Sequence, residues 1–290
     1  MLRITALISL LLLASVHAQN GNLQRWMLVT PPGTVSVSDA QFGDVELLQD
    51  GRAPKQGRPT IQQEVPFRIG LVFDESGSGR SLPSHDAVLE HVLGWAGNAV
   101  QQRKGDAFLV GFNDQIVTST EITADISQLR HALSQLRSFG GSAVRDAVIH
   151  SAQKFDSVRQ ESRPMARLLV IVTDGHDNAS YAKERGVIES VERSGVRVYV
   201  IGLPTPETSD GKSFMERLSG DTGGQAFFPT NQNDLDRVLA AIEHVITSSF
   251  LIGFVPEAHD GKAHKLTVKL SKAGSINLGY MPVFYAPSAQ

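Results

Sequence analysis

Short apolar runs alternate with longer amphipathic stretches between residues 67 and 250. The short runs predict β-strands at residues 68–73, 107–112, 167–173, 197–202 and 225–228. The run at 167–173 is apolar throughout rather than alternating, which is typical of a central parallel strand covered on both faces. A sheet built from such strands needs helices on both sides.

The longer stretches repeat apolar residues at intervals of three and four, which predicts helices through residues 88–100, 126–136, 144–155, 181–193 and 234–246. Asn231 and Asn233 are candidate N-caps of the last helix, and Gly195 is placed to end the fourth. Strands and helices in this order predict an α/β fold with a doubly wound, mostly parallel sheet and helices on both faces.

The two flanks of this region have a different pattern of short strand-like segments, at 34–38, 44–48, 250–255, 264–270 and 276–281. Turn-forming residues stand between them at 49–52, 260–261 and 273–274. We expect the flanks to meet in a small β-layer beside the α/β domain. The expected division is a signal peptide at 1–18, an N-terminal β segment at 19–66, the α/β domain at 67–249 and a C-terminal β extension at 250–290.

The N-terminus has the features of a secretory signal peptide. Arg3 precedes an apolar run from Ile4 to Val16, and small residues at Val16 and Ala18 suit cleavage before Gln19. The run is roughly 13 residues long, short of the roughly 20 that span a bilayer. We therefore expect export to the periplasm or the medium, with no membrane span in the mature protein.

Composition narrows the chemistry more than it identifies a function. The absence of cysteine excludes disulfides, thiolate metal sites and a lipid anchor on a thiol. The apolar share of 41% is ordinary for a globular protein, and a formal net charge of −3 gives no indication of a nucleic acid or an anionic membrane as partner. Composition leaves the oligomeric state open.

The segment from Asp74 to Ser78 is the clearest candidate for chemistry, because the pattern D-x-S-x-S follows directly on a predicted strand. Asp74, Ser76 and Ser78 place one carboxylate and two hydroxyls on a single turn, as a hard divalent cation requires. Ser142 precedes a predicted helix, and Asp174 follows the strand at 167–173. In open α/β sheets the loops beyond the strand C-termini form the binding crevice, so these three segments are expected to converge.

With these segments the chain resembles the von Willebrand factor type A domain over about residues 67–250. The metal-ion-dependent adhesion site of that family combines D-x-S-x-S with a later threonine and a later aspartate. The resemblance implies a metal held by Asp74, Ser76, Ser78, Ser142 and Asp174, with serine at the usual threonine position. It also implies direct binding by the hydroxyls, aspartates that act largely through water, and an open coordination position for a carboxylate of a partner. The flanks are similar to those of secreted bacterial proteins with this domain.

The same residues also have structural interpretations. The turn at 74–78 and Asp174 could simply shape strand ends, and Ser142 could cap the helix that follows it. We expect His85 to lie on a polar helix face, and Asp177 and Ser180 to shape their loop and cap the helix predicted at 181. The segment 211–213 resembles the end of a phosphate-binding loop, but Pro206 stands where that motif has glycine, so a turn is expected.

The residues favour an exported binding module that is not an enzyme. It would hold Mg²⁺, with Mn²⁺ and Ca²⁺ as alternatives, and use the cation to bind a Glu or Asp carboxylate of a protein partner. One alternative is a scaffold in which the metal is structural and the β flanks make the contacts. A metal-dependent hydrolase is the other, although the sequence offers no G-x-S-x-G nucleophile motif and no evident general base.

Overall fold

The computed structural model describes residues 24–31, 45–55, 58–78, 85–157, 163–205, 208–270 and 278–288. The expected signal peptide at 1–18, the strand at 34–38 and the turn at 273–274 lie outside these residues. The strand expected at 276–281 lies only partly inside them, and there Gly279 forms an isolated bridge with Thr30.

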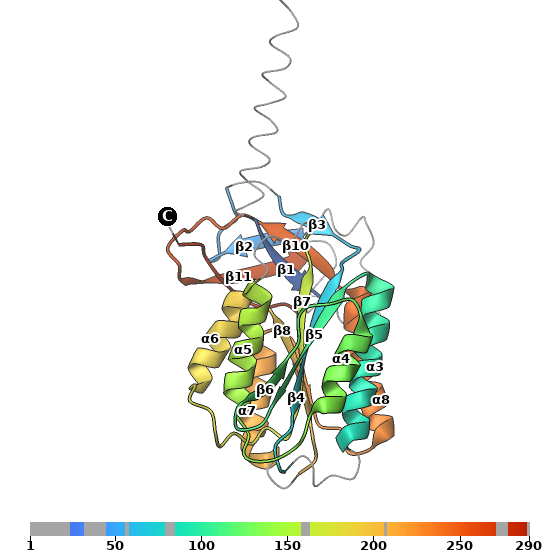
Figure 1. The fold of residues 1–290 in the computed structure, drawn as a ribbon. Coiled ribbons are helices and arrows are strands. Elements are labelled where there is room, and N and C mark those ends of the chain that lie inside the picture. Colours follow the sequence, from blue (N-terminus) through green and yellow to red (C-terminus); the bar gives the residue numbers. More distant parts are fainter. Residues whose placement is uncertain are drawn as a thin grey trace, which may run out of the picture.

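The central sheet contains six strands among the described residues, in the order β6-β5-β4-β7-β8-β9 (Figure 1). The strands are β4 (Phe67–Asp74), β5 (Asp106–Phe112), β6 (Ile116–Ser119), β7 (Ala166–Thr173), β8 (Arg197–Gly202) and β9 (Gln225–Phe227). All neighbouring pairs are parallel except β5 with β6. The five predicted strands are confirmed to within one residue at each end.

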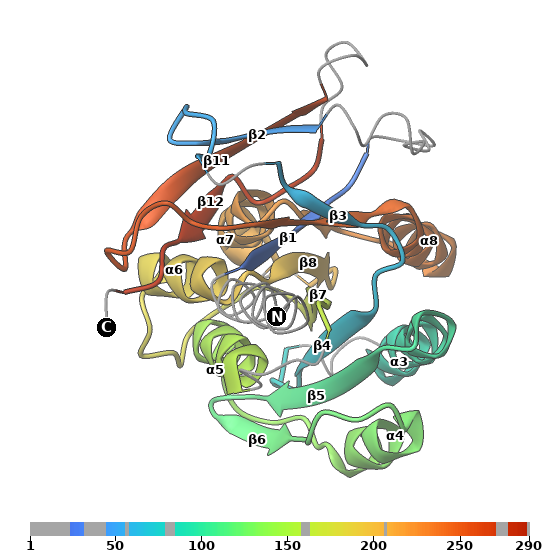
Figure 2. The ribbon, with the colours of Figure 1, turned by 90° about the horizontal axis from the view of Figure 1, so that it is seen from above.

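Six helices lie in the described part of the chain. They are α3 (His85–Arg103), α4 (Ile126–Gln135), α5 (Val144–Ser157), α6 (Glu184–Ser194), α7 (Thr208–Asp221) and α8 (Gln232–Ser248). Apolar residues of α3, α4 and α8 pack on one face of the sheet, and those of α5, α6 and α7 pack on the other. Figure 2 shows α3, α4 and α8 on one side of the strands and α5 and α6 on the other, which confirms the predicted doubly wound architecture.

The alternation of side chains along β4 decides which way its last residue points. All residues of this strand are buried. Ile69, Leu71 and Phe73 enter the core under α3, α4 and α8, whereas Val72 enters the core under α5, α6 and α7. Since side chains two positions apart share a face, Asp74 at the strand end lies on the α5 side.

The helix ends follow the predicted capping residues in two cases. The side chain of Asn231 accepts a hydrogen bond from the Asp234 N–H and caps α8, and Gly195 ends α6 in the left-handed conformation with φ of 63°. Helix α6 begins at Glu184, three residues later than predicted, because the residues before it bond to the first turn of α5 instead.

The prediction of a turn at 211–213 is wrong, because these residues lie inside α7. Gly211 and Gly220 weaken the helical signal of α7 in the sequence. Its apolar residues Phe214, Met215 and Leu218 nevertheless form one buried stripe against the sheet. Tertiary packing therefore outweighs local propensity here.

The chain termini form a separate layer of two antiparallel sheets. One has the order β1 (Arg25–Val29), β10 (Phe250–Phe254), β3 (Thr60–Gln62), and the other has the order β12 (Val283–Tyr285), β11 (Ala263–Leu270), β2 (Val45–Gln49). Their apolar faces share a core that includes Val29, Leu47, Ile252, Leu266 and Phe284. The flanks thus meet as predicted, as two packed sheets.

The turn after β2 has the predicted hairpin form. Asp50 and Gly51 both have positive φ, 49° and 79°, and the backbones of Gln49 and Arg52 exchange two hydrogen bonds. Two central residues in the left-handed region are the mark of a type I′ turn, which matches the twist of the flanking strands.

The layer of terminal sheets adjoins the amino ends of the parallel strands. Arg197, the first residue of β8, donates hydrogen bonds to the carbonyls of Leu28 at 2.7 Å and Gly279 at 2.9 Å, and to the hydroxyl of Thr30. In Figure 1 this layer lies above the helices, and β4 runs down from it. Asp74 therefore lies at the opposite pole of the molecule. Among the described helices, none is long and apolar enough to cross a bilayer.

Candidate metal centre

Asp74 is the central residue of the candidate site. Its side chain is 1% exposed at the carboxyl end of β4. Oδ1 accepts a hydrogen bond from the Ser76 N–H at 3.0 Å, and Oδ2 accepts from the hydroxyls of Ser142 at 3.0 Å and Thr173 at 2.5 Å. Three segments that are far apart in the sequence therefore meet at one carboxylate.

The two serines of D-x-S-x-S lie side by side. The hydroxyl oxygens of Ser76 and Ser78 are 3.2 Å apart, with Ser76 buried and Ser78 partly exposed. Neighbouring ligand oxygens of an octahedral Mg²⁺ ion are about 2.9 Å apart, given metal–oxygen distances of about 2.1 Å. Both this pair and the pair formed by Ser142 and Asp74 have nearly that separation.

Ser142 is held in place by its backbone. Its N–H donates to the side-chain oxygen of Asn178 at 2.8 Å, and its carbonyl accepts from the N–H groups of Asn178 and Ala179, both at 3.1 Å. On its other side Gly140, with φ of 74°, accepts a hydrogen bond from the Gly77 N–H. The Ser142 hydroxyl points to Asp74 and does not cap α5.

Asp174 follows β7 and is likewise only 1% exposed. One carboxylate oxygen accepts from the His176 N–H at 3.0 Å, and the other from the Thr205 hydroxyl at 3.3 Å. Gly175 turns the chain sharply after it, with φ of 79°. Asp74 thus ends strand β4, and the other four residues predicted from the sequence lie on loops at the carboxyl end of the sheet.

In the part of the chain that the structure describes, the Asp74 carboxylate has no positively charged hydrogen-bond partner. Its hydrogen-bond donors in the described part of the chain are hydroxyls and a backbone N–H, all neutral. The pKa of Asp74 is raised to about 6, chiefly by burial and to a smaller extent by the charge of Asp174, while hydrogen bonds from Ser76 and Thr173 oppose the rise. Buried charges in proteins are normally paired or bound to a metal. Two buried carboxylates that have only neutral hydrogen-bond donors among the described residues form the charge pattern of a cation site.

The donor types fit a hard divalent cation. No group of three or more His, Cys, Asp or Glu side chains in the described residues could hold a metal ion. A cation bound here would therefore need hydroxyl oxygens together with the two carboxylates, and such an all-oxygen set suits Mg²⁺, Mn²⁺ or Ca²⁺ rather than a softer metal.

Several residues of the site do not stand out in the sequence. Thr173 reaches Asp74 from the last position of β7, where it reads as an ordinary strand residue. Glu75 is 4% exposed, and its carboxylate accepts a hydrogen bond from the Ser138 hydroxyl. His85 is 2% exposed with its Nε2 atom 3.0 Å from the Asp74 carbonyl, so the prediction that it lies on a polar helix face is wrong. Only its position at the start of α3, beside the D-x-S-x-S loop, hints at this contact.

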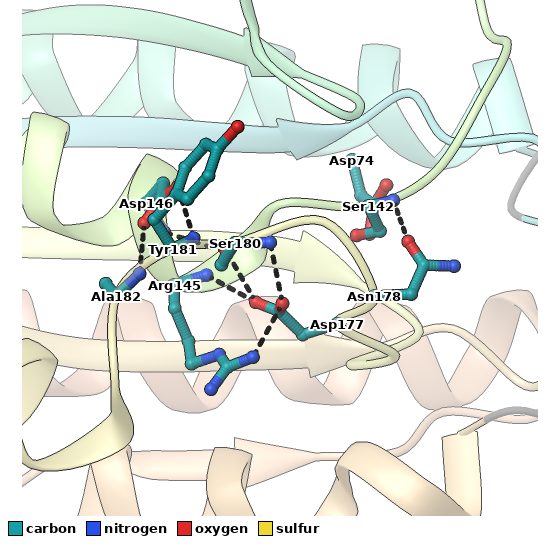
Figure 3. A network of polar contacts seen from close by, with 9 residues as sticks. All are labelled: Asp74, Ser142, Arg145, Asp146, Asp177, Asn178, Ser180, Tyr181 and Ala182. Carbon is teal, nitrogen blue, oxygen red and sulfur yellow. Dashed lines mark hydrogen bonds and ion pairs between the residues drawn. The ribbon is translucent and has the colours of Figure 1, made fainter.

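A network of polar contacts supports the loop after Asp174 (Figure 3). Asp177 accepts hydrogen bonds from the Arg145 N–H at 2.8 Å and its guanidinium at 2.9 Å, and from Ser180. Burial favours a higher pKa for Asp177, but these hydrogen bonds outweigh it and the pKa is lowered. Asp177 and Ser180 thus shape the loop as predicted. They cap α5, however, and not the helix that follows them.

Comparison with known protein families identifies the domain that carries these loops. Residues 69–241 match the model of the von Willebrand factor type A domain. The chain belongs to this family. The matched residues begin in β4 and end in α8, so they contain all three loops of the candidate site. A search of curated proteins gave no match.

Solved structures agree with the fold of this vWA domain. The von Willebrand factor type A protein from Catenulispora acidiphila has a TM-score of 0.51 at 11% identity, with 92% of this chain and 74% of that chain covered. The pilus adhesin SpaC from Lactobacillus rhamnosus GG has a TM-score of 0.51 at 11% identity, with 87% and 49% covered. Proximal thread matrix protein 1 from the mussel byssus, with a zinc-occupied MIDAS motif, has 0.50 at 15% identity, with 67% and 49% covered. At these identities the likeness extends to the fold alone.

Proposed function

We propose that this vWA domain binds one divalent cation through Asp74, Ser76, Ser78, Ser142 and Asp174. Mg²⁺ is the first candidate, and Mn²⁺ and Ca²⁺ are alternatives. The observation that carries the proposal is the pair of buried carboxylates whose hydrogen-bond partners in the described residues are all neutral. A cation would supply the missing positive charge.

The bound cation would serve to hold an acidic group of a protein partner. Its chemical contribution would be an electrophilic position, since neutral hydroxyl ligands leave more of the cationic charge exposed than carboxylates do. Ser78 is the partly exposed member of the set, so the site opens toward solvent on its side. A Glu or Asp carboxylate is the ligand whose charge and hardness match such a position. We infer recognition of a protein and no catalytic reaction.

The cellular setting is part of the same proposal. The N-terminal sequence supports export to the periplasm or the exterior, and the pilus adhesin among the structural neighbours supports a role outside the cytoplasm. We further propose that the vWA domain comprises residues 67–249, between the β segments at 19–66 and 250–290.

Metal-dependent capture of partners tests this function. The protein without residues 1–18 would be immobilised and exposed to an envelope fraction of its source organism in Mg²⁺ or in EDTA. We expect partners that are retained in Mg²⁺, released by EDTA and lost with Asp74→Asn. Short peptides containing Asp should compete for them, whereas the matched Asn peptides should not.

The outcomes separate the three functional hypotheses. Partners retained equally in EDTA and by Asp74→Asn would contradict the proposal and favour a scaffold that binds through its β-sheets. Turnover of an ester, phosphate or peptide substrate that disappears in Asp74→Asn would contradict it in favour of a hydrolase. Asp125→Asn is the matched control, because Asp125 caps α4 on the surface and Asn caps a helix equally well.

A further inference from the structure

Two exposed aromatic side chains lie on loops that are hydrogen-bonded to residues of the candidate metal centre. Among the described residues, only three large apolar side chains are exposed: Val117 at 36%, Phe139 at 54% and Tyr181 at 98%. Val117 lies on the edge strand β6. Phe139 lies on the loop before Ser142, which is hydrogen-bonded to the D-x-S-x-S segment. Tyr181 lies on the loop after Asp174, which is hydrogen-bonded to Ser142 through Asn178.

Tyr181 has a fixed backbone and a free ring. Its N–H and that of Ala182 each donate to the carboxylate of Asp146 at 2.9 Å, and the Asp146 N–H donates to the Ser180 hydroxyl. Figure 3 shows these contacts and, to one side of them, the Asn178 contact to Ser142. A loop held to helix α5 by three hydrogen bonds has little backbone freedom left to lose on binding, so the ring is preorganised for a contact.

The backbone of Phe139 is fixed by hydrogen bonds between its loop and the D-x-S-x-S segment. Its N–H donates to the carbonyl of Glu75 at 3.0 Å, and the Ser138 hydroxyl donates to the Glu75 carboxylate. The next residue, Gly140, accepts from the Gly77 N–H at 3.1 Å. Phe139 and Gly140 are therefore hydrogen-bonded to Glu75 and Gly77, the two residues that stand between the proposed ligands Asp74, Ser76 and Ser78 in the sequence.

We propose that Phe139 and Tyr181 form an aromatic rim that selects the partner of the metal site. This inference rests on the proposed function, and it specifies the partner as a protein segment in which an Asp or Glu is flanked by an apolar side chain. The carboxylate of such a segment occupies the metal position, and its apolar neighbour packs against the rim. Exposed aromatic rings supply large contact areas at small entropic cost and are frequent hot spots of interfaces.

Peptide selection provides the probe. A phage-displayed library of random dodecapeptides would be panned on the immobilised protein in Mg²⁺ and eluted with EDTA. We expect the eluted peptides to contain an Asp or Glu with Phe, Tyr, Trp, Leu or Ile within two positions. The best peptide would then be synthesised and its affinity measured for the wild type and for Tyr181→Ala, Phe139→Ala and the control Val117→Ala.

The expected losses of affinity are about tenfold for Tyr181→Ala and for Phe139→Ala, the low end for a hot-spot aromatic, and less than twofold for Val117→Ala. Both rim variants should still bind Mn²⁺ as the wild type does. EDTA-eluted peptides that carry an acidic residue without an apolar neighbour, or that bind both rim variants with unchanged affinity, would overturn the rim and leave the proposed function intact. If EDTA elutes no acidic peptide, the proposed function fails and the rim fails with it.

Discussion

At the scale of single residues, the carboxylate of Asp74 is fixed by hydroxyls from two other segments. Thr173 is the closer of the two, with its hydroxyl 2.5 Å from Oδ2. The hydroxyl oxygen of Thr173 also accepts a hydrogen bond from the Gly175 N–H at 2.9 Å, so Thr173 sets the turn that carries Asp174 as well. One buried hydroxyl thus positions both carboxylates of the site.

Replacing Thr173 tests this role. Thr173→Val keeps the shape and removes the hydroxyl, which leaves a buried carboxylate oxygen and a buried N–H each short of one partner. We expect a loss of about 1–3 kcal/mol in the free energy of unfolding, measured in urea, and weaker Mg²⁺ binding. Thr173→Ser should lose less on both counts because it keeps the hydroxyl. A valine variant as stable as the serine variant would contradict the role.

The five proposed metal ligands could be predicted from sequence because each stands at a strand end or loop within a known pattern. Their supporting residues could not. Thr173 directly precedes Asp174, but nothing in the sequence shows that its hydroxyl reaches Asp74. Asn178 holds the Ser142 N–H only because two loops separated by 36 positions meet in space. Contacts of this kind depend on the register of the whole sheet, which local patterns do not contain.

At the scale of elements, α7 packs directly on the turn after Asp174. A Cβ atom built on Gly211 would lie 1.9 Å from the Gly175 carbonyl oxygen, closer than atoms can approach. The helix therefore requires glycine at this position, although glycine lowers its intrinsic helical propensity.

Two glycines of α7 make a matched pair for measurement. Gly211→Ala should destabilise the protein by about 1–3 kcal/mol, because the helix must move away from the turn. Gly220→Ala has no atom within 4 Å of the new methyl group, so it should stabilise the helix by about 0.5–1 kcal/mol. The free energies of unfolding of both variants, measured in urea, should therefore change in opposite directions. Equal effects would contradict the close packing of α7 on the turn.

The connection between the β2 hairpin and β11 should depend on pH. His264 lies between two carboxylates, with Nδ1 2.7 Å from Asp50 and Nε2 3.0 Å from Asp260. The hydrogen bonds to Asp260 and Asp50 raise the pKa of His264 above 6.5, and the pKa values of both aspartates are lowered from 3.8. The charged imidazolium thus contributes stability below pH 6.5 and loses it as pH rises through the raised pKa.

The variant His264→Gln makes this pH dependence measurable. Wild type should exceed the variant in melting temperature by the largest margin near pH 5 to 6. The margin should shrink as pH rises above 6.5, and shrink again as pH falls through the lowered pKa values of the aspartates. A margin that stays constant from pH 5 to 9, or grows with pH, would contradict the contact.

The elements that sequence patterns predicted correctly are those whose apolar residues form a continuous run or recur at a regular spacing. Strand β7 and helix α8 are examples, with buried residues at the expected spacing. Strand β6 has four residues, of which alternate ones are exposed, so its pattern is too short to detect. Helix α7 is concealed in the sequence by its two glycines, of which its packing requires Gly211.

At the scale of the whole molecule, the candidate site and the terminal sheets occupy opposite ends of the parallel strands. Arg197 joins the sheets to the domain through hydrogen bonds to Leu28, Thr30 and Gly279. Burial lowers the pKa of its guanidinium, because the charged form loses its contact with water. The hydrogen bonds to Leu28, Thr30 and Gly279 offset this cost. The sequence predicted that the flanks meet. It did not predict the pairing of β1 with β10, because antiparallel partners so distant in sequence leave no local signal.

Breaking this join should leave the opposite pole unaffected. Arg197→Met removes three hydrogen bonds and should lower the free energy of unfolding by about 1–3 kcal/mol in urea. Metal binding of the folded variant should not change. Arg130→Met, at an exposed arginine of α4, should change stability by less than about 0.5 kcal/mol. Loss of metal binding together with stability would contradict the separation of the two poles.

The most direct test of the metal centre counts bound Mn²⁺ by electron paramagnetic resonance of the free ion. The protein without residues 1–18 would be freed of metal with EDTA, dialysed and titrated with Mn²⁺. The wild type and the surface control Asp125→Asn should each bind one Mn²⁺ ion per chain, displaceable by Mg²⁺, and Asp174→Asn should lose that binding. A wild type that binds no Mn²⁺, or an Asp174→Asn variant that binds it equally well, would contradict the assignment of the site.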